Sequence, residues 1–165
     1  YVPGTRKDGS PLPAAVKDPN KALGPEQNDN TLNYVALGFG NQSTTGVIIL
    51  SFGPKKILNQ NGSAPDLRVW ETSAGSYGGS TLAGSTYSFG GETSSYPETA
   101  RVEASKDGVT WVVVGYVTSN SPMVNLGSLP WAKYIKLVDV TDRKSKKSDV
   151  DGFDLDAVQG LNCGG

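Results

Sequence analysis

Short apolar-rich runs separated by turn-forming residues constrain the fold of this chain more than any other sequence feature. Glycine and proline, 21 and 10 in number, recur between the runs, and no segment shows a convincing helical period. Runs of this kind are typical of β-strands. The pattern predicts an all-β fold, an antiparallel β-sandwich, with strands over 33–39, 46–52, 66–71, 99–105, 110–117, 132–140 and 153–159.

Alternation within these runs indicates which face of each strand is buried. Ile135 and Leu137 fall on one face of their run and Lys136 on the other, as expected of a strand with one buried face. Between two other runs, Asp107 and Gly108 supply the positive φ angles of a tight turn. The strands on either side of that turn are therefore expected to pair.

The length of 165 residues and the mass of 17.3 kDa fit a single domain covering residues 1–165. Residues 1–15 are expected to form a loose start and residues 162–165 a tail. Residues 72–98 form a long stretch rich in Gly, Ser and Tyr, which predicts a functional excursion or a short extra hairpin. The single cysteine, Cys163, excludes an internal disulfide and a cysteine-rich metal site.

The chain contains no histidine, which excludes Ser-His-Asp and Cys-His catalysis and zinc bound through histidine. Fifteen basic and sixteen acidic residues give a net charge of −1, so a nucleic-acid partner is not expected. No apolar run reaches the ~18 residues of a membrane-spanning helix. We therefore expect a soluble chain and no catalytic residues.

Carboxylates gather near the C-terminus and at the start of the third predicted strand. Asp154 and Asp156 are two residues apart on one strand, which would point both side chains the same way, about 7 Å apart. Calcium, which takes six to eight oxygen ligands, would relieve their repulsion, although the spacing does not fit an EF-hand. The alternative is that these acids cap turns and solvate strand ends beside neighbouring basic residues.

Five motifs follow one another along the chain: DP-x-x-ALG, a GFGG-like strand start, D-[LF]-x-V-[WF]-E, V-x-x-S-x-DG-x-x-W and GFDLDAV. They stand at Asp18 to Gly24, Leu37 to Asn41, Asp66 to Glu71, Val102 to Trp111 and Gly152 to Val158. With these motifs in this order, the chain resembles a group of bacterial secreted and cell-surface β-sandwich domains. The hairpin followed by AKYIKL also resembles discoidin-type and galactose-binding-like jelly rolls, including calcium-containing carbohydrate-binding modules.

This resemblance implies a jelly roll, a structural calcium ion and a secreted or cell-surface role in carbohydrate binding or adhesion. The metal ligands that we expect are Asp156 and Asp154 first, then Asp18, Asp66 and Asp139. Aromatic rings stack on sugars, so the expected ligand-binding residues are the loop aromatics Tyr77, Tyr87, Tyr96 and Trp131. Each of these rings could instead pin its own loop, and Trp70 and Trp111 are interpreted as packing residues.

Three functional hypotheses follow. The first is a non-catalytic, calcium-stabilised extracellular module that binds polysaccharide or a cell-surface glycan. The second is a structural or protein-binding module of a larger surface protein. The third is a small glycoside hydrolase or lyase that uses a carboxylate pair such as Glu71 and Glu98.

Overall fold

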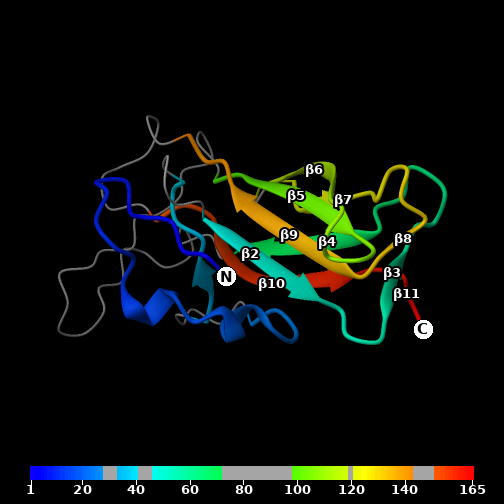
Figure 1. Cartoon of the computed structure of the whole chain (residues 1–165), viewed down its shortest axis with the longest axis horizontal. Coiled ribbons are helices and arrows are strands. Elements are labelled where there is room, and N and C mark those ends of the chain that lie inside the picture. The colour runs from blue at the N-terminus through cyan, green and yellow to red at the C-terminus, as the bar shows by residue number, and fades with distance from the viewer. Residues whose placement is uncertain (28–32, 41–45, 72–97, 119–120, 143–150) are drawn as a thin grey trace.

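A computed structural model describes residues 1–27, 33–40, 46–71, 98–118, 121–142 and 151–165 of the chain. Most of the regular structure in these residues is antiparallel β-sheet, which confirms the all-β prediction (Figure 1). Two short 3-10 helices, η1 (Ala14–Val16) and η2 (Pro19–Ala22), precede the first strand. None of the helices in these residues is long and apolar enough to cross a membrane.

The strands of the described residues form two four-stranded sheets and one three-stranded sheet. The first sheet has the order β1 (Val35–Ala36), β10 (Asp154–Gly160), β4 (Leu67–Glu71) and β7 (Met123–Val124). The second has the order β2 (Val47–Ser51), β9 (Tyr134–Asp139), β5 (Ala100–Ser105) and β6 (Val112–Val117). The small third sheet joins β11 (Cys163–Gly164), β3 (Lys56–Leu58) and β8 (Trp131–Ala132) at one end of the molecule.

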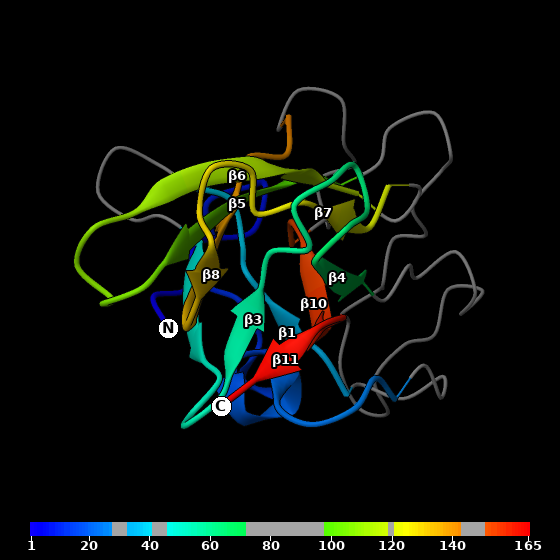
Figure 2. The ribbon, with the colours of Figure 1, turned by 90° about the vertical axis from the view of Figure 1, so that its right-hand side faces the viewer.

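The hydrophobic core contains side chains of both four-stranded sheets. Figure 2 shows β5 and β6 in one layer and β4 and β10 in the other. Ile48, Leu137 and Val102 face the core from paired positions of β2, β9 and β5. Leu155 and Val69 meet them from the opposite sheet. Lys136, next to Leu137, is only partly buried and Ile49, next to Ile48, is exposed, as the alternation predicted for Leu137 and Lys136.

Strand β10 departs from simple alternation. Its register against β4 shifts between Leu155 and Ala157, so Asp156 is the extra residue of a β-bulge. Leu155 lies in the core, and three residues later Val158 also packs against it. The sequence pattern predicted that Asp154 and Asp156 occupy equivalent positions of a regular strand. The bulge makes their positions different.

The two chain ends, residues 1–15 and 162–165, which we expected to be a loose start and a tail, both contain residues that form backbone pairs. Val2 pairs with Val47, and Thr5 pairs with Phe39, so the first residues extend the sheet edges. At the other end, Cys163 pairs with Ile57. These contacts explain the difference: an extended backbone at an open sheet edge finds partners whatever its side chains are.

Candidate functional site

Five carboxylates lie at the end of the molecule where β4 and β9 finish and β10 begins, on the left in Figure 1. Antiparallel pairing causes this meeting, because the last residue of one strand lies beside the first residue of the next. Leu155 pairs with Glu71 and Ala100 pairs with Asp139, which brings both layers' acidic ends to the same place. We call this group the acidic cluster; it consists of Glu71, Glu98, Asp139, Asp151 and Asp154.

Asp154 is the buried member around which the cluster is arranged. Asp154 is 5% exposed, and its Oδ1 atom has no hydrogen-bond partner among the described residues. Burial raises the pKa of Asp154 well above its usual range, and the negative charges of Asp151, Glu98, Glu71 and Asp139 raise it further. The position therefore favours a proton or a cation at this carboxylate.

Asp139 is held by backbone donors. Its carboxylate accepts hydrogen bonds from the amides of Thr141, at 2.8 Å, and Phe153. Burial raises the pKa of Asp139 to about 6 despite these hydrogen bonds, which act in the opposite direction. Gly152 makes room for the carboxylate, because a Cβ there would lie 2.2 Å from Asp139 Oδ2.

The N-terminal tyrosine borders the same cluster. The Tyr1 hydroxyl donates a hydrogen bond to the carbonyl of Ala36, which pairs with Asp154 in β1 and β10. Burial, followed by the negative charges of Asp154 and Asp151, raises the pKa of the Tyr1 hydroxyl. Tyr1 therefore stays a neutral donor at the edge of the cluster.

Two of the five predicted metal ligands, Asp154 and Asp139, belong to the acidic cluster. The other three have partners of their own. Asp156 accepts from the Gln27 amide at 3.0 Å, and Asp18 caps η2 by accepting from the Asn20 amide, also at 3.0 Å. Asp66 is fully buried and accepts from the amides of Leu126, at 2.8 Å, and Gln60, at 3.0 Å.

Sequence reasoning gave no metal role to Glu71, Glu98 and Asp151. The usable signal was their position at strand boundaries: Glu71 ends β4, Glu98 stands two residues before β5, and Asp151 stands three before β10. Boundary acids of antiparallel neighbours meet once the pairing is known. Glu71 and Glu98, which the third hypothesis considered as a catalytic pair, both lie near Asp154, because the charge of each raises the pKa of that residue.

The donor set of the acidic cluster consists of hard carboxylate oxygens, which suit Ca²⁺. Within the described ranges, no three Asp, Glu or Cys side chains are grouped so that they could hold a metal ion by themselves. Calcium also accepts backbone carbonyls and water, so two carboxylates can suffice for part of its shell. Asp154 Oδ1, buried and without a hydrogen-bond partner, fits such an ion.

Of the predicted ligand-binding aromatics, Tyr77, Tyr87 and Tyr96 lie outside the described residues. Trp131 lies on β8, half-buried, with the ammonium groups of Lys56 and Lys106 over its ring at 4.7 and 5.4 Å from the centroid. Trp111, interpreted as a packing residue, is also only half-buried and stacks under Lys136.

Comparison of the chain with protein-family models, with curated proteins and with solved structures finds no match.

Proposed function

We propose that this chain is a non-catalytic, calcium-stabilised extracellular binding module with a jelly-roll fold, and that its ligand is a carbohydrate. The strand order supports the jelly roll. Outside the small third sheet, β1 pairs with β10, β2 with β9, β4 with β7 and β5 with β6. The first strand thus pairs with the last and each following pair is nested within it, as in an eight-stranded double-sheet jelly roll.

One observation carries the calcium part of the proposal: Asp154 is buried among four other carboxylates with an unsatisfied oxygen. A buried ionised carboxylate is costly unless it is paired, and among the described residues the charges that act most on the pKa of Asp154 are those of other carboxylates. Asp154 and Asp151 are the ligands that we propose. A bound Ca²⁺ would supply positive charge, and Asp154 and Asp151 would hold it and link the start of β10 to the neighbouring strand ends.

The carbohydrate part rests on half-buried aromatic rings at the surface. Trp131 and Trp111 keep part of each indole accessible, and an indole stacks on the apolar face of a sugar. The absence of histidine from the chain removes the commonest acid–base and nucleophile-activating residue, which favours binding over catalysis.

Thermal melting in calcium and in excess chelator tests the proposal. With calcium at about 100 times its Kd, linkage adds ~2.7 kcal/mol, which corresponds to roughly 5–10 °C in a domain of this size. Asp154→Asn should abolish this shift. In chelator at pH 7 it should melt no lower than the wild type, because it removes a charge that repels four others.

Asp66→Asn is the matched control. It replaces one of the two carboxylate oxygens that accept backbone amides with an NH2 group, far from the acidic cluster, so it should lower the melting temperature and keep the calcium shift. A wild-type melt that is the same in calcium and chelator, with no bound metal by elemental analysis, would contradict the calcium site. Sugar release from a polysaccharide that Glu71→Gln abolishes would contradict the non-catalytic assignment and favour a glycoside hydrolase.

A further inference from the structure

Lysine ammonium groups and aromatic rings gather at the end of the molecule opposite the acidic cluster. Lys56, from β3, and Lys106, from the turn between β5 and β6, both lie over the indole of Trp131 in β8. Three separate segments therefore converge on one ring. Two like charges share this ring, because each ammonium group is attracted to the electron-rich face of the indole.

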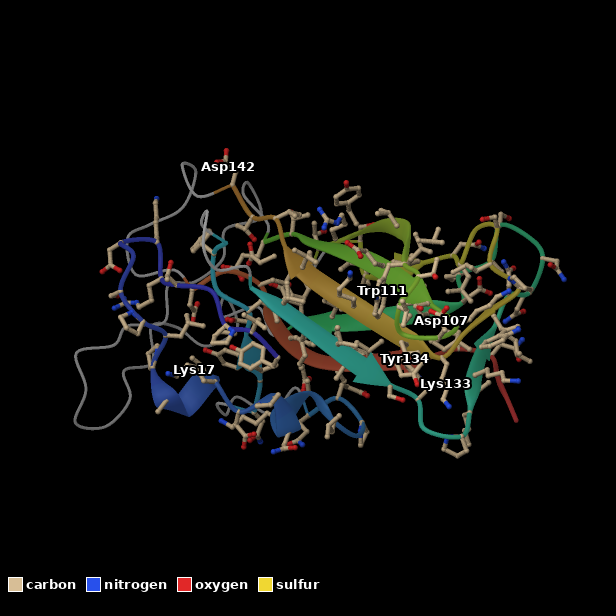
Figure 3. The ribbon with its side chains drawn as sticks, viewed as in Figure 1. Lys17, Asp107, Trp111, Lys133, Tyr134 and Asp142 are labelled. Atoms are coloured by element: carbon tan, nitrogen blue, oxygen red, sulfur yellow. The ribbon has the colours of Figure 1, made fainter. Side chains whose placement is uncertain are left out.

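The same arrangement continues onto the outer face of the β2–β9–β5–β6 sheet. Lys133 lies 5.8 Å from the centroid of Tyr134, and Lys136 lies 4.3 Å from that of Trp111. Figure 3 shows Trp111, Tyr134 and Lys133 close together beside the hairpin of β5 and β6. We call the whole set the basic–aromatic surface; it consists of Lys56, Lys106, Trp111, Trp131, Lys133 and Tyr134.

Nearby acids are already engaged. Glu103 binds Arg101 at 2.8 Å and Lys136, so its charge is matched within the sheet. Asp107 accepts from the amides of Val109 and Thr110 in the hairpin turn. Over the part of the chain that the structure describes, Lys56, Lys106 and Lys133 have no carboxylate partner. These three lysines therefore outweigh the ionised Asp107 beside them, and the surface presents net positive charge beside stacking rings.

We propose that the basic–aromatic surface binds an acidic polysaccharide, one whose sugar rings carry carboxylate or sulfate groups. This inference rests on the carbohydrate function proposed above and specifies its ligand class. The indole of Trp131 stacks on the apolar face of a pyranose, and Lys56 and Lys106 pair with the acidic group of the same or the next sugar. Their flexible stems let both ammonium groups leave the ring for the anion at small cost.

The observations favour an acidic glycan over nucleic acid. The chain carries a net charge of −1, and its opposite end holds the acidic cluster, which would repel a long polyanion that wrapped the molecule.

Isothermal titration with a matched ligand pair tests the inference: a short oligogalacturonate and its methyl ester, which keeps the sugar rings and removes the charges. Heparin serves as a second acidic glycan and a single-stranded DNA oligonucleotide as a non-glycan polyanion. We expect binding of the free acid, weakened by salt, and much weaker binding of the ester. The double variant Lys56→Gln/Lys106→Gln should bind about tenfold more weakly.

Lys17→Gln is the matched control, a lysine change at the opposite end of the molecule (Figure 3), and should leave affinity unchanged. Lys106 is exposed, so we expect the single Lys106→Gln variant to fold normally and to show part of the loss of affinity of the double variant.

Equal binding of acid and ester would overturn the acidic ligand and leave the carbohydrate function standing. Absence of binding to both acidic glycans, or tighter binding to DNA, would overturn the inference, while the calcium shift tests the proposed metal site separately.

Discussion

At the residue scale, Gly152 shows how one missing side chain makes the acidic cluster possible. Gly152 has φ +79°, a conformation that an L side chain rarely adopts, and the Asp139 carboxylate occupies the space of its Cβ. Asp139 can accept the Phe153 amide because nothing stands between them. Both conditions, backbone conformation and space, therefore require glycine at this position.

Replacing Gly152 by alanine should destabilise the protein more than the same change at Gly127. Gly127 also has positive φ, +62°, but nothing lies within 4 Å of a Cβ placed there. Gly127→Ala should cost only the backbone strain, ~1–2 kcal/mol. Gly152→Ala adds the clash with Asp139, so we expect roughly 2 kcal/mol more in urea denaturation. Equal losses would show that the Asp139 carboxylate moves aside freely.

The sequence could not distinguish the roles of individual acids, because that role depends on partners far along the chain. Asp66 was predicted to bind metal, yet it accepts the amide of Leu126, sixty residues away. Asp107, by contrast, is bound within its own turn, where the amides of Thr110 and Val109 lower its pKa to about 2. Local motifs such as this turn are predictable, whereas long-range acceptors become visible only with the fold.

At the element scale, the seven predicted strands correspond to β1, β2, β4, β5, β6, β9 and β10. The sequence did not predict β3, β7 and β11, and it did not separate β8 from β9. Those four have only two or three residues, too few for an alternation pattern, and exist because a neighbouring strand offers hydrogen bonds. The bulge at Asp156 was also hidden, since an extra residue is defined only against the partner strand.

The N-terminal segment should protect the edges that it covers. The amide of Val47 donates to Val2, and that of Phe39 donates to Thr5. In a chain that lacks residues 1–5, hydrogen exchange of both amides should accelerate at least tenfold, because they lose these acceptors. The amide of Asp66, which donates to Val124 at the other end, is the internal control. Unchanged exchange at Val47 and Phe39 would mean that the segment does not hold these edges in solution.

At the scale of the whole molecule, the acidic cluster and the basic–aromatic surface lie at opposite ends of a nearly neutral chain. The acidic cluster lies where β4 and β9 end, and the basic–aromatic surface lies around β3, β8 and the β5–β6 hairpin at the opposite end. The antiparallel strands connect the two regions through one core, so a ligand at either end stabilises the same folding unit. A cation at one end and a polyanion at the other are thus compatible with net charge −1.

The acidic cluster should make stability fall as pH rises when no calcium is present. Burial raises the pKa of Asp139 to about 6 and that of Asp154 well above its usual range. A raised folded-state pKa gives stability that is complete below the unfolded-state value near 3.8 and is lost as pH rises through the folded-state value. In chelator, the free energy of unfolding should therefore decrease by roughly 2–3 kcal/mol between pH 4.5 and pH 7.

Calcium should remove this decrease, because the ion replaces the protons that the cluster otherwise holds. Denaturation at pH 4.5, 5.5, 6.5 and 7 with and without calcium measures both slopes. Asp107 and Glu103, whose pKa values are lowered, act in the opposite sense, and their contribution is lost as pH falls below their unfolded-state values of 3.8 and 4.5, at or below the lower limit of this range. Asp154→Asn should flatten the chelator curve, because it removes one titrating group whose pKa is raised in the folded state. Stability in chelator that rises from pH 4.5 to pH 7 would show that the buried carboxylates are already neutralised by other charges, which would remove the physical reason for calcium at this end of the molecule.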